Sequence, residues 1–173
     1  MAENEADSAA IATEGLVYSI KARISQDRFI SAKCCIFKTP TILRELNKKA
    51  YVPDAFSIGP FHHGRPEFKD TDKIKSQYLQ GLISRSRSQE TILRDLINSV
   101  KQVEREAREC YAGTIDYSSD EFVKILVIDG CFIIELFRKY AFNELREVDD
   151  PVFAMACMMQ FLFHDLILLA EAA

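Results

Sequence analysis

The sequence lacks the features that several large classes of protein require. Its 22 Lys and Arg residues are outnumbered by 26 Asp and Glu residues, which gives a net charge of −4. Because nucleic-acid binding needs a basic surface, we expect no nucleic-acid partner. The acidic N-terminal segment MAENEADSAAIATEG has neither the basic nor the apolar region of a secretory signal. Five cysteines are an odd number, and Cys34 and Cys35 are adjacent, so we expect reduced thiols in a cytoplasmic protein.

Motifs of catalysis and metal binding are also missing. The sequence contains no C-x-x-C, H-x-x-x-H, H-E-x-x-H, G-x-S-x-G or glycine-rich phosphate loop. We therefore expect no metal ion, no cofactor and no enzymatic activity. His164 and Asp165 are adjacent in a predicted helix, where successive side chains point about 100° apart. We expect His164 at the border of that helix and Asp165 facing solvent or a partner arginine.

No apolar run has the length and purity of a membrane-spanning helix. The segment 125–137 is short and contains Asp129, and the segment 151–170 carries Gln160, His164 and Asp165. A membrane partner is therefore not expected, although a peripheral membrane protein anchored by the last helix is an alternative.

What the sequence does contain is helical periodicity, whereas the alternation typical of strands is nearly absent. Helices are predicted from Thr39 to Lys49, from Asp70 to Arg85, from Gln89 to Tyr111, from Phe122 to Tyr140 and from Asp150 onward. The helix predicted from Phe122 to Tyr140 is apolar almost all round, so we predict that it lies at the centre of the fold. Ser118 and Glu121, just before it, have the spacing of a capping box.

These patterns predict an all-α fold of mostly antiparallel helices. Residues 1–16 are expected to be a disordered acidic leader, residues 17–169 a single helical domain, and residues 170–173 a short tail.

One segment interrupts the helical pattern: 51-YVPDAFSIGPFHHGRPEF-68, called the strap below. It holds three of the five prolines, two of the six glycines and two of the three histidines. Proline fixes φ and restricts the residue before it, so helix is not expected here. Gly59 and Gly64 permit positive φ, which predicts two consecutive turns. The side chains predicted to point inward are Tyr51, Phe56, Ile58 and Phe61. His62 and His63 are expected to face opposite sides, one of them towards Asp129 and the other towards solvent.

Asp129 is the most unusual charged residue in the chain. At 100° per residue it falls within the most apolar face of the predicted central helix. A buried carboxylate without a cation or hydrogen-bond donors costs several kcal/mol. We therefore predict an internal ion pair with Arg105 or Arg108, or a contact with a strap histidine.

Six segments in order carry a resemblance to a known family. They are 34-CCIFKTP-40, 42-ILRELNKKAYVPDAFSIGPFHHG-64, 73-KIKSQYL-79, 106-EARECY-111, 119-SDEFVKILVIDGCFIIELF-137 and 165-DLILL-169. Together they resemble the plant family called domain of unknown function 247, or UPF0481-like, over residues 17–169. The resemblance identifies a signature loop made of Tyr51, Pro53, Ser57, Ile58, Gly59, Pro60, His62, His63 and Gly64.

The resemblance implies a role rather than a reaction. Family members are typically several hundred residues long, end in a transmembrane helix, and are implicated in plant reproduction. The expected function is that of a non-enzymatic regulatory or recognition protein in self-incompatibility or in sex expression, such as suppression of female organ development. Its expected partners are proteins, either full-length relatives or a second copy of the chain.

This sequence departs from the family pattern after Leu169, where AEAA ends the chain. We therefore expect a truncated member that lacks the family's C-terminal half and membrane anchor. The alternative function is that of a small-molecule-binding or hydrolytic domain centred on His62, His63 and Asp129.

Overall fold

The structure is a computed structural model that describes residues 13–23 and 35–172. The chain divides into two units, Met1–Lys33 and Cys34–Ala173. In the first unit, a helix covers residues 13–23 and its residues are almost all exposed. The predicted domain start at residue 17 falls inside this helix, whereas the larger unit begins at Cys34. Residues 1–12 of the predicted leader lie outside the described residues.

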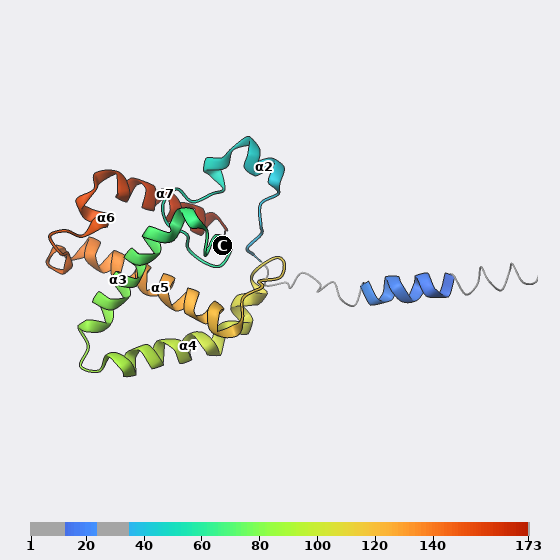
Figure 1. Cartoon of the computed structure of the whole chain (residues 1–173), viewed down its shortest axis with the longest axis horizontal. Coiled ribbons are helices and arrows are strands. Elements are labelled where there is room, and N and C mark those ends of the chain that lie inside the picture. Colours follow the sequence, from blue (N-terminus) through green and yellow to red (C-terminus); the bar gives the residue numbers. More distant parts are fainter. Residues whose placement is uncertain (1–12, 24–34, 173) are drawn as a thin grey trace, which may run out of the picture. The chain divides into compact units, whose positions relative to one another are not determined.

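The larger unit is all-α, as predicted (Figure 1). Its α-helices are α2 (Thr41–Leu46), α3 (Lys69–Ser84), α4 (Gln89–Glu109), α5 (Ser119–Ala141), α6 (Pro151–Ala154) and α7 (Ala156–Ala172). Short 3-10 helices occur at η1 (Lys48–Ala50), η2 (Pro66–Phe68) and η3 (Asn143–Leu145). Figure 1 shows α4 and α5 running in opposite directions, joined by the loop that follows Glu109.

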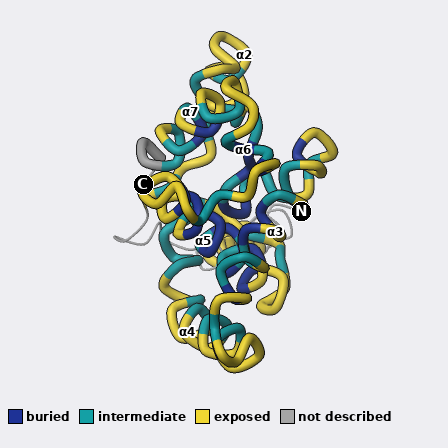
Figure 2. The backbone as a smooth tube through the Cα atoms, turned by 90° about the vertical axis from the view of Figure 1, so that its left-hand side faces the viewer, coloured by how far each residue is buried: buried dark blue, intermediate teal, exposed yellow. Residues whose placement is uncertain are grey.

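Helix α5 is the centre of this unit, because it is buried on two faces. One face presents Val123, Val127 and Cys131 to apolar residues of α3 and α4. The other presents Phe132 and Leu136 to a second cluster, whose remaining buried members are Phe56, Tyr78, Val152 and Leu162. Figure 2 shows the buried positions gathered on α5 and α3, while much of α4 is exposed. The prediction of a central helix is confirmed.

Two predicted helices end or break earlier than the sequence pattern indicated. The first ends at Leu46, because Asn47 leaves the helical region with φ −146° and ψ 80° before η1 begins. The last is divided into α6 and α7 at Met155, which has extended backbone angles of φ −104° and ψ 108°. Helix α7 then continues to Ala172, past the predicted end at residue 169.

A short backbone contact ties the start of the larger unit to the end of α4. Ile36 and Tyr111 form an isolated parallel bridge. The Cys35 and Ile36 N–H groups both donate to the Cys110 carbonyl, at 3.0 and 2.9 Å, and the Ala112 N–H donates to the Ile36 carbonyl at 2.8 Å. In the described part of the chain, this bridge is the only β-pairing, and it is one residue pair long. This bridge holds residues 35–39 in place as one wall of the pocket described below.

The predicted capping box at the start of α5 is present and can be tested. Ser118 Oγ accepts from the Glu121 N–H, and the Glu121 carboxylate accepts from the Ser118 N–H. We expect Ser118→Ala to lower the free energy of unfolding by about 1 kcal/mol, because one helix N–H loses its acceptor. Urea denaturation measures the change. Glu121→Gln retains an acceptor at the same place and should cost less, and equal losses in the two variants would contradict the capping role.

Candidate functional site

The strap crosses the helical core without helix between residues 51 and 65. Gly59 and Gly64 have φ values of 79° and 75°, which confirms the two predicted turns. Phe56 is fully buried and its ring stacks on Phe132 with centroids 5.1 Å apart. Tyr51 departs from the expected inward orientation, since it is 37% exposed.

Asp165 of α7 fixes the first half of the strap. Its two carboxylate oxygens accept hydrogen bonds from three successive backbone N–H groups, those of Asp54, Ala55 and Phe56, at 2.6, 2.9 and 2.7 Å. Burial raises the pKa of Asp165, and the three N–H donors oppose that shift. The prediction that Asp165 faces solvent or an arginine is wrong. Asp165 faces the strap instead, because its carboxylate is the acceptor for three strap amides that lie outside any helix.

Asp129 of α5 fixes the middle of the strap. Its carboxylate accepts from the Gly59 N–H at 2.8 Å and lies 2.7 Å from Lys75 Nζ. Lys75 also donates to the Ser57 carbonyl at 2.8 Å, and Asp72 Oδ1 lies 2.8 Å from the same ammonium. Burial raises the pKa of Asp129, while Lys75 and the Gly59 N–H lower it.

The predicted burial of Asp129 is confirmed, but its predicted arginine partners are wrong. Arg105 pairs with Glu109 along α4, with Nε 3.8 Å from the carboxylate. Arg108 pairs with Glu104 at 2.9 Å and donates to carbonyls of the loop before α5. Both arginines therefore bind groups of α4 or of the loop that follows it. The cation that pairs with Asp129 is Lys75 of α3.

The strap histidines line different cavities. His63 lies with Asp129 and Lys75 in a pocket of about 310 Å³, and its ring contacts Tyr117 edge to face at 5.8 Å. The hydrogen bonds of the Asp129 carboxylate come from Lys75 and Gly59, not from either histidine. His62 lines the other of the two pockets. The two histidines line different pockets, as opposite orientations predict, but His62 is half-buried in its pocket and does not face open solvent. His62 does not join His63 and Asp129 in one centre.

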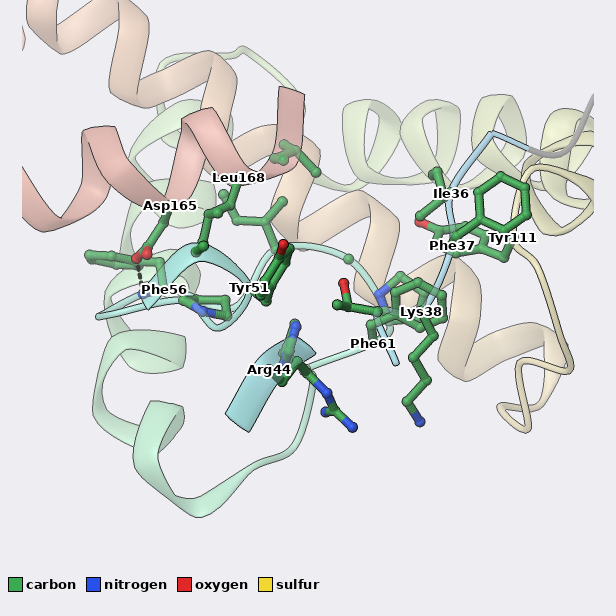
Figure 3. Close-up of a pocket in the computed structure, with 18 of the residues that line it drawn as sticks. Ile36, Phe37, Lys38, Arg44, Tyr51, Phe56, Phe61, Tyr111, Asp165 and Leu168 are labelled. Carbon is green, nitrogen blue, oxygen red and sulfur yellow. Dashed lines mark hydrogen bonds between the residues drawn. The ribbon is translucent and has the colours of Figure 1, made fainter. Parts of the chain in front are cut away.

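The pocket that His62 lines, called the strap pocket below, is drawn in Figure 3. Its volume is about 320 Å³. Its walls come from residues 35–39, α2, the strap and the end of α7. The side chains that matter for its chemistry are Phe37, Lys38, Arg44, Tyr51, Phe61, His62, Arg65, Tyr111, Asp165 and Leu168. A pocket of this size with mostly apolar walls and a few polar groups is typical of small-ligand sites.

The strap pocket is basic although the chain as a whole is acidic. Lys38, Arg44 and Arg65 line it, and the nearest acid to Arg65 is Glu67, at 4.0 Å. Burial, followed by the charges of Arg65, Arg44 and Lys38, lowers the pKa of His62 from 6.5 to about 4. His62 therefore lies neutral in the pocket at physiological pH.

Asp54, His164 and Asp165 form a cluster whose potential ligand atoms lie within 4.8 Å of one another. His164 Nδ1 is 3.1 Å from Asp54 Oδ2 and 3.7 Å from Asp165 Oδ1. The oxygens of Asp165 already accept hydrogen bonds from three amide N–H groups of the strap. The cluster is therefore better explained as a group that holds the strap in place than as a metal site.

The sequence analysis did not predict that Lys75 pairs with Asp129 or that Asp165 accepts hydrogen bonds from the strap. It also did not predict the three cations that line the strap pocket. A signal for Lys75 did exist, because it shares a helix face with Leu79 and Leu82, which pack against the core. A charge within an apolar arc indicates a buried partner. Arg44 and Arg65 carried no such signal, since their segments are short and polar.

Comparison with known proteins relates most of the larger unit to a plant family. The model of the family described as plant protein of unknown function, domain of unknown function 247, matches residues 36–171. The chain belongs to this family. It is 32% identical over 137 residues to one UPF0481 protein of Arabidopsis thaliana, covering 79% of this chain and 28% of that protein. A second, putative UPF0481 protein of the same plant is 24% identical over 134 residues, covering 78% of this chain and 25% of the relative.

The chain thus spans about a quarter of the length of these two family members. No solved structure matches it significantly. Among the described residues, no helix is both long and apolar enough to cross a bilayer.

The buried Asp129–Lys75 pair predicts a large and specific loss of stability. We expect Lys75→Met to lower the free energy of unfolding by about 3–5 kcal/mol, because it leaves Asp129 buried with an uncompensated charge. Adding Asp129→Leu should recover part of the loss. Urea denaturation of the single and double variants measures both effects.

Lys73→Met is the matched control, since Lys73 lies on the same helix in an exposed pair with Asp70 and should cost under about 1 kcal/mol. A Lys75→Met variant as stable as Lys73→Met would show that the buried pair does not hold the strap.

The lowered pKa of His62 predicts an acid-dependent loss of stability. Between pH 6.5 and about 4, the unfolded chain binds a proton at this residue and the folded chain does not, so stability falls as the pH falls through this window. NMR titration of the imidazole should give a pKa of about 4. His62→Gln should make unfolding less pH-dependent across the same range. A pKa at or above 6.5 would contradict the geometry of the pocket.

Proposed function

We propose that the larger unit is a non-enzymatic recognition module that acts through protein–protein contacts in plant reproductive development. The resemblance to the family supports the biological setting, which is sex expression or self-incompatibility. We further propose that it acts in the cytoplasm and that its partners are longer relatives or a second copy of the chain.

The observation that carries the proposal is an exposed apolar surface, the α5–α7 face, formed by Phe137, Tyr140, Phe163 and Ile167. Each of the four side chains is between 44% and 57% exposed. The rings of Tyr140 and Phe163 meet edge to face at 6.0 Å, so the two helices present one continuous surface. Aromatic side chains exposed together are typical of protein interaction sites.

Three buried carboxylates support a role without catalysis, because each has a structural partner. Asp129 binds Lys75, Asp165 binds the strap amides, and Glu135 pairs with Arg85. A catalytic acid or base needs a position from which it can reach a substrate. These three carboxylates are instead held by the fold.

A complementation experiment in the plant tests the proposal. Loss of the gene should alter floral organs or pollen, and the wild-type chain should restore them. We expect Phe137→Ser combined with Phe163→Ser to fail to restore the phenotype, because both changes remove exposed aromatic contact area without touching the core. The variant must first be shown to fold by circular dichroism and to match the wild type in urea denaturation.

The matched variant is His62→Ala combined with His63→Ala, which should restore the phenotype when it folds. Restoration by the α5–α7 variant together with failure of a folded histidine variant would overturn the proposal. That result would favour the alternative of a small-molecule-binding or hydrolytic domain.

A further inference from the structure

The strap pocket contains more positive charge than its own residues neutralise. Lys38, Arg44 and Arg65 line it from three separate segments. Asp165 is the carboxylate among the lining residues, and both its oxygens accept strap amides. Glu67 approaches Arg65 only to 4.0 Å and is itself exposed. The pocket is therefore lined by three cationic side chains and one carboxylate, whose oxygens are already hydrogen-bonded.

Two nitrogen atoms of the lining residues are buried without a hydrogen-bond partner among the residues that the structure describes. They are Arg44 Nε and His62 Nδ1. The Arg44 guanidinium makes one hydrogen bond, from Nη2 to Thr41 Oγ1 at 3.2 Å. Buried polar groups in folded proteins are almost always paired, and an unpaired one costs free energy. A ligand that brings an acceptor to this guanidinium would remove that cost.

The remaining walls fit a planar apolar body. Phe37, Tyr51, Phe61 and Tyr111 supply aromatic surface, and Leu168 closes the side next to α7 (Figure 3). Phe61 and Tyr111 pack edge to face at 5.1 Å, which holds both rings in position. Guanidinium groups bind carboxylates and phosphates through paired, charge-assisted hydrogen bonds.

We propose that the strap pocket binds a small organic anion, with a carboxylate or phosphate held by Arg44 and Arg65 and an aromatic body held by the surrounding rings. This goes beyond the recognition role, which rests on the α5–α7 face. Either proposal can fail without the other.

His62 provides a readout at the site itself. Burial, followed by the charges of Arg65, Arg44 and Lys38, lowers the pKa of its imidazole, and Glu67 is the opposing charge. A bound anion offsets the three cations, so the pKa of His62 should rise from about 4 when the pocket is filled. Binding on another surface would leave this titration unchanged.

The experiment uses four probes that distinguish the contribution of the anionic head group from that of the aromatic body. They are 2-naphthoate, 2-naphthyl phosphate, neutral 2-naphthylmethanol and inorganic phosphate. Binding to the full chain is measured by calorimetry and by the NMR signal of His62. At least one naphthyl anion should bind about tenfold more tightly than the alcohol and than inorganic phosphate, as one charge-assisted hydrogen bond implies. Which of the two anions binds better identifies the head group.

Variants locate the binding site. Arg44→Ala and Arg65→Ala should each weaken binding about tenfold. Arg44→Lys keeps the charge and should weaken it less. Arg94→Ala changes an exposed arginine of α4, which contributes no residue to the pocket, and should leave binding unchanged. Each variant is compared with the wild type by circular dichroism before titration.

Three results would overturn the proposal. The first is no binding of either naphthyl anion, and the second is equal binding of the neutral alcohol. The third is binding that Arg44→Ala and Arg65→Ala leave unchanged while the pKa of His62 stays at its free value.

Discussion

The structure depends on satisfying the backbone of a buried segment that is not a helix. The strap lies against the core between Pro53 and Pro60, where no helical or strand partner pairs its polar groups. Its N–H groups at residues 54, 55, 56 and 59 bind the carboxylates of Asp165 and Asp129, and its Ser57 carbonyl binds Lys75. Thr71 Oγ1 donates to the Ala55 carbonyl at 2.7 Å. Side chains of α3, α5 and α7 thus replace the missing backbone partners.

This arrangement explains why charged residues occur in the most apolar helices. A carboxylate that accepts several N–H bonds tolerates burial that would otherwise exclude it. Asp129 and Asp165 are each 3% exposed, and Lys75 is 1% exposed. The arginines of the strap pocket hold no buried carboxylate in this way, because Arg44 donates to Thr41 and Arg65 lies 4.0 Å from the exposed Glu67. Their charges therefore remain available to a ligand.

The segments that carry the family resemblance meet in space at the strap. The segment 73-KIKSQYL-79 supplies Lys75, the segment 119–137 supplies Asp129, and 165-DLILL-169 supplies Asp165. The first of these segments lies in α3, directly after the strap, whereas the other two are separated from it by at least two helices in sequence. The physical meaning of these motifs is that distant helices hold one irregular loop. The proposed interaction surface and the proposed anion pocket are both built around this framework.

The sequence by itself determined the elements whose causes are local. Helical periodicity predicted α3, α4 and α5 to within about two residues at most ends, and Ser118 with Glu121 marked the start of α5 through a capping box. Proline and glycine spacing predicted an irregular strap with turns at Gly59 and Gly64, since these residues restrict or permit particular backbone angles wherever they occur. Only the tertiary structure decided that Lys75, rather than an arginine, pairs with Asp129, and that Asp165 binds the strap. Lys75 and Asp129 are 54 positions apart in sequence, and Asp165 is 109 to 111 positions from the amides it binds. Which side chain reaches a buried acid depends on how the helices pack, and no local pattern encodes that packing.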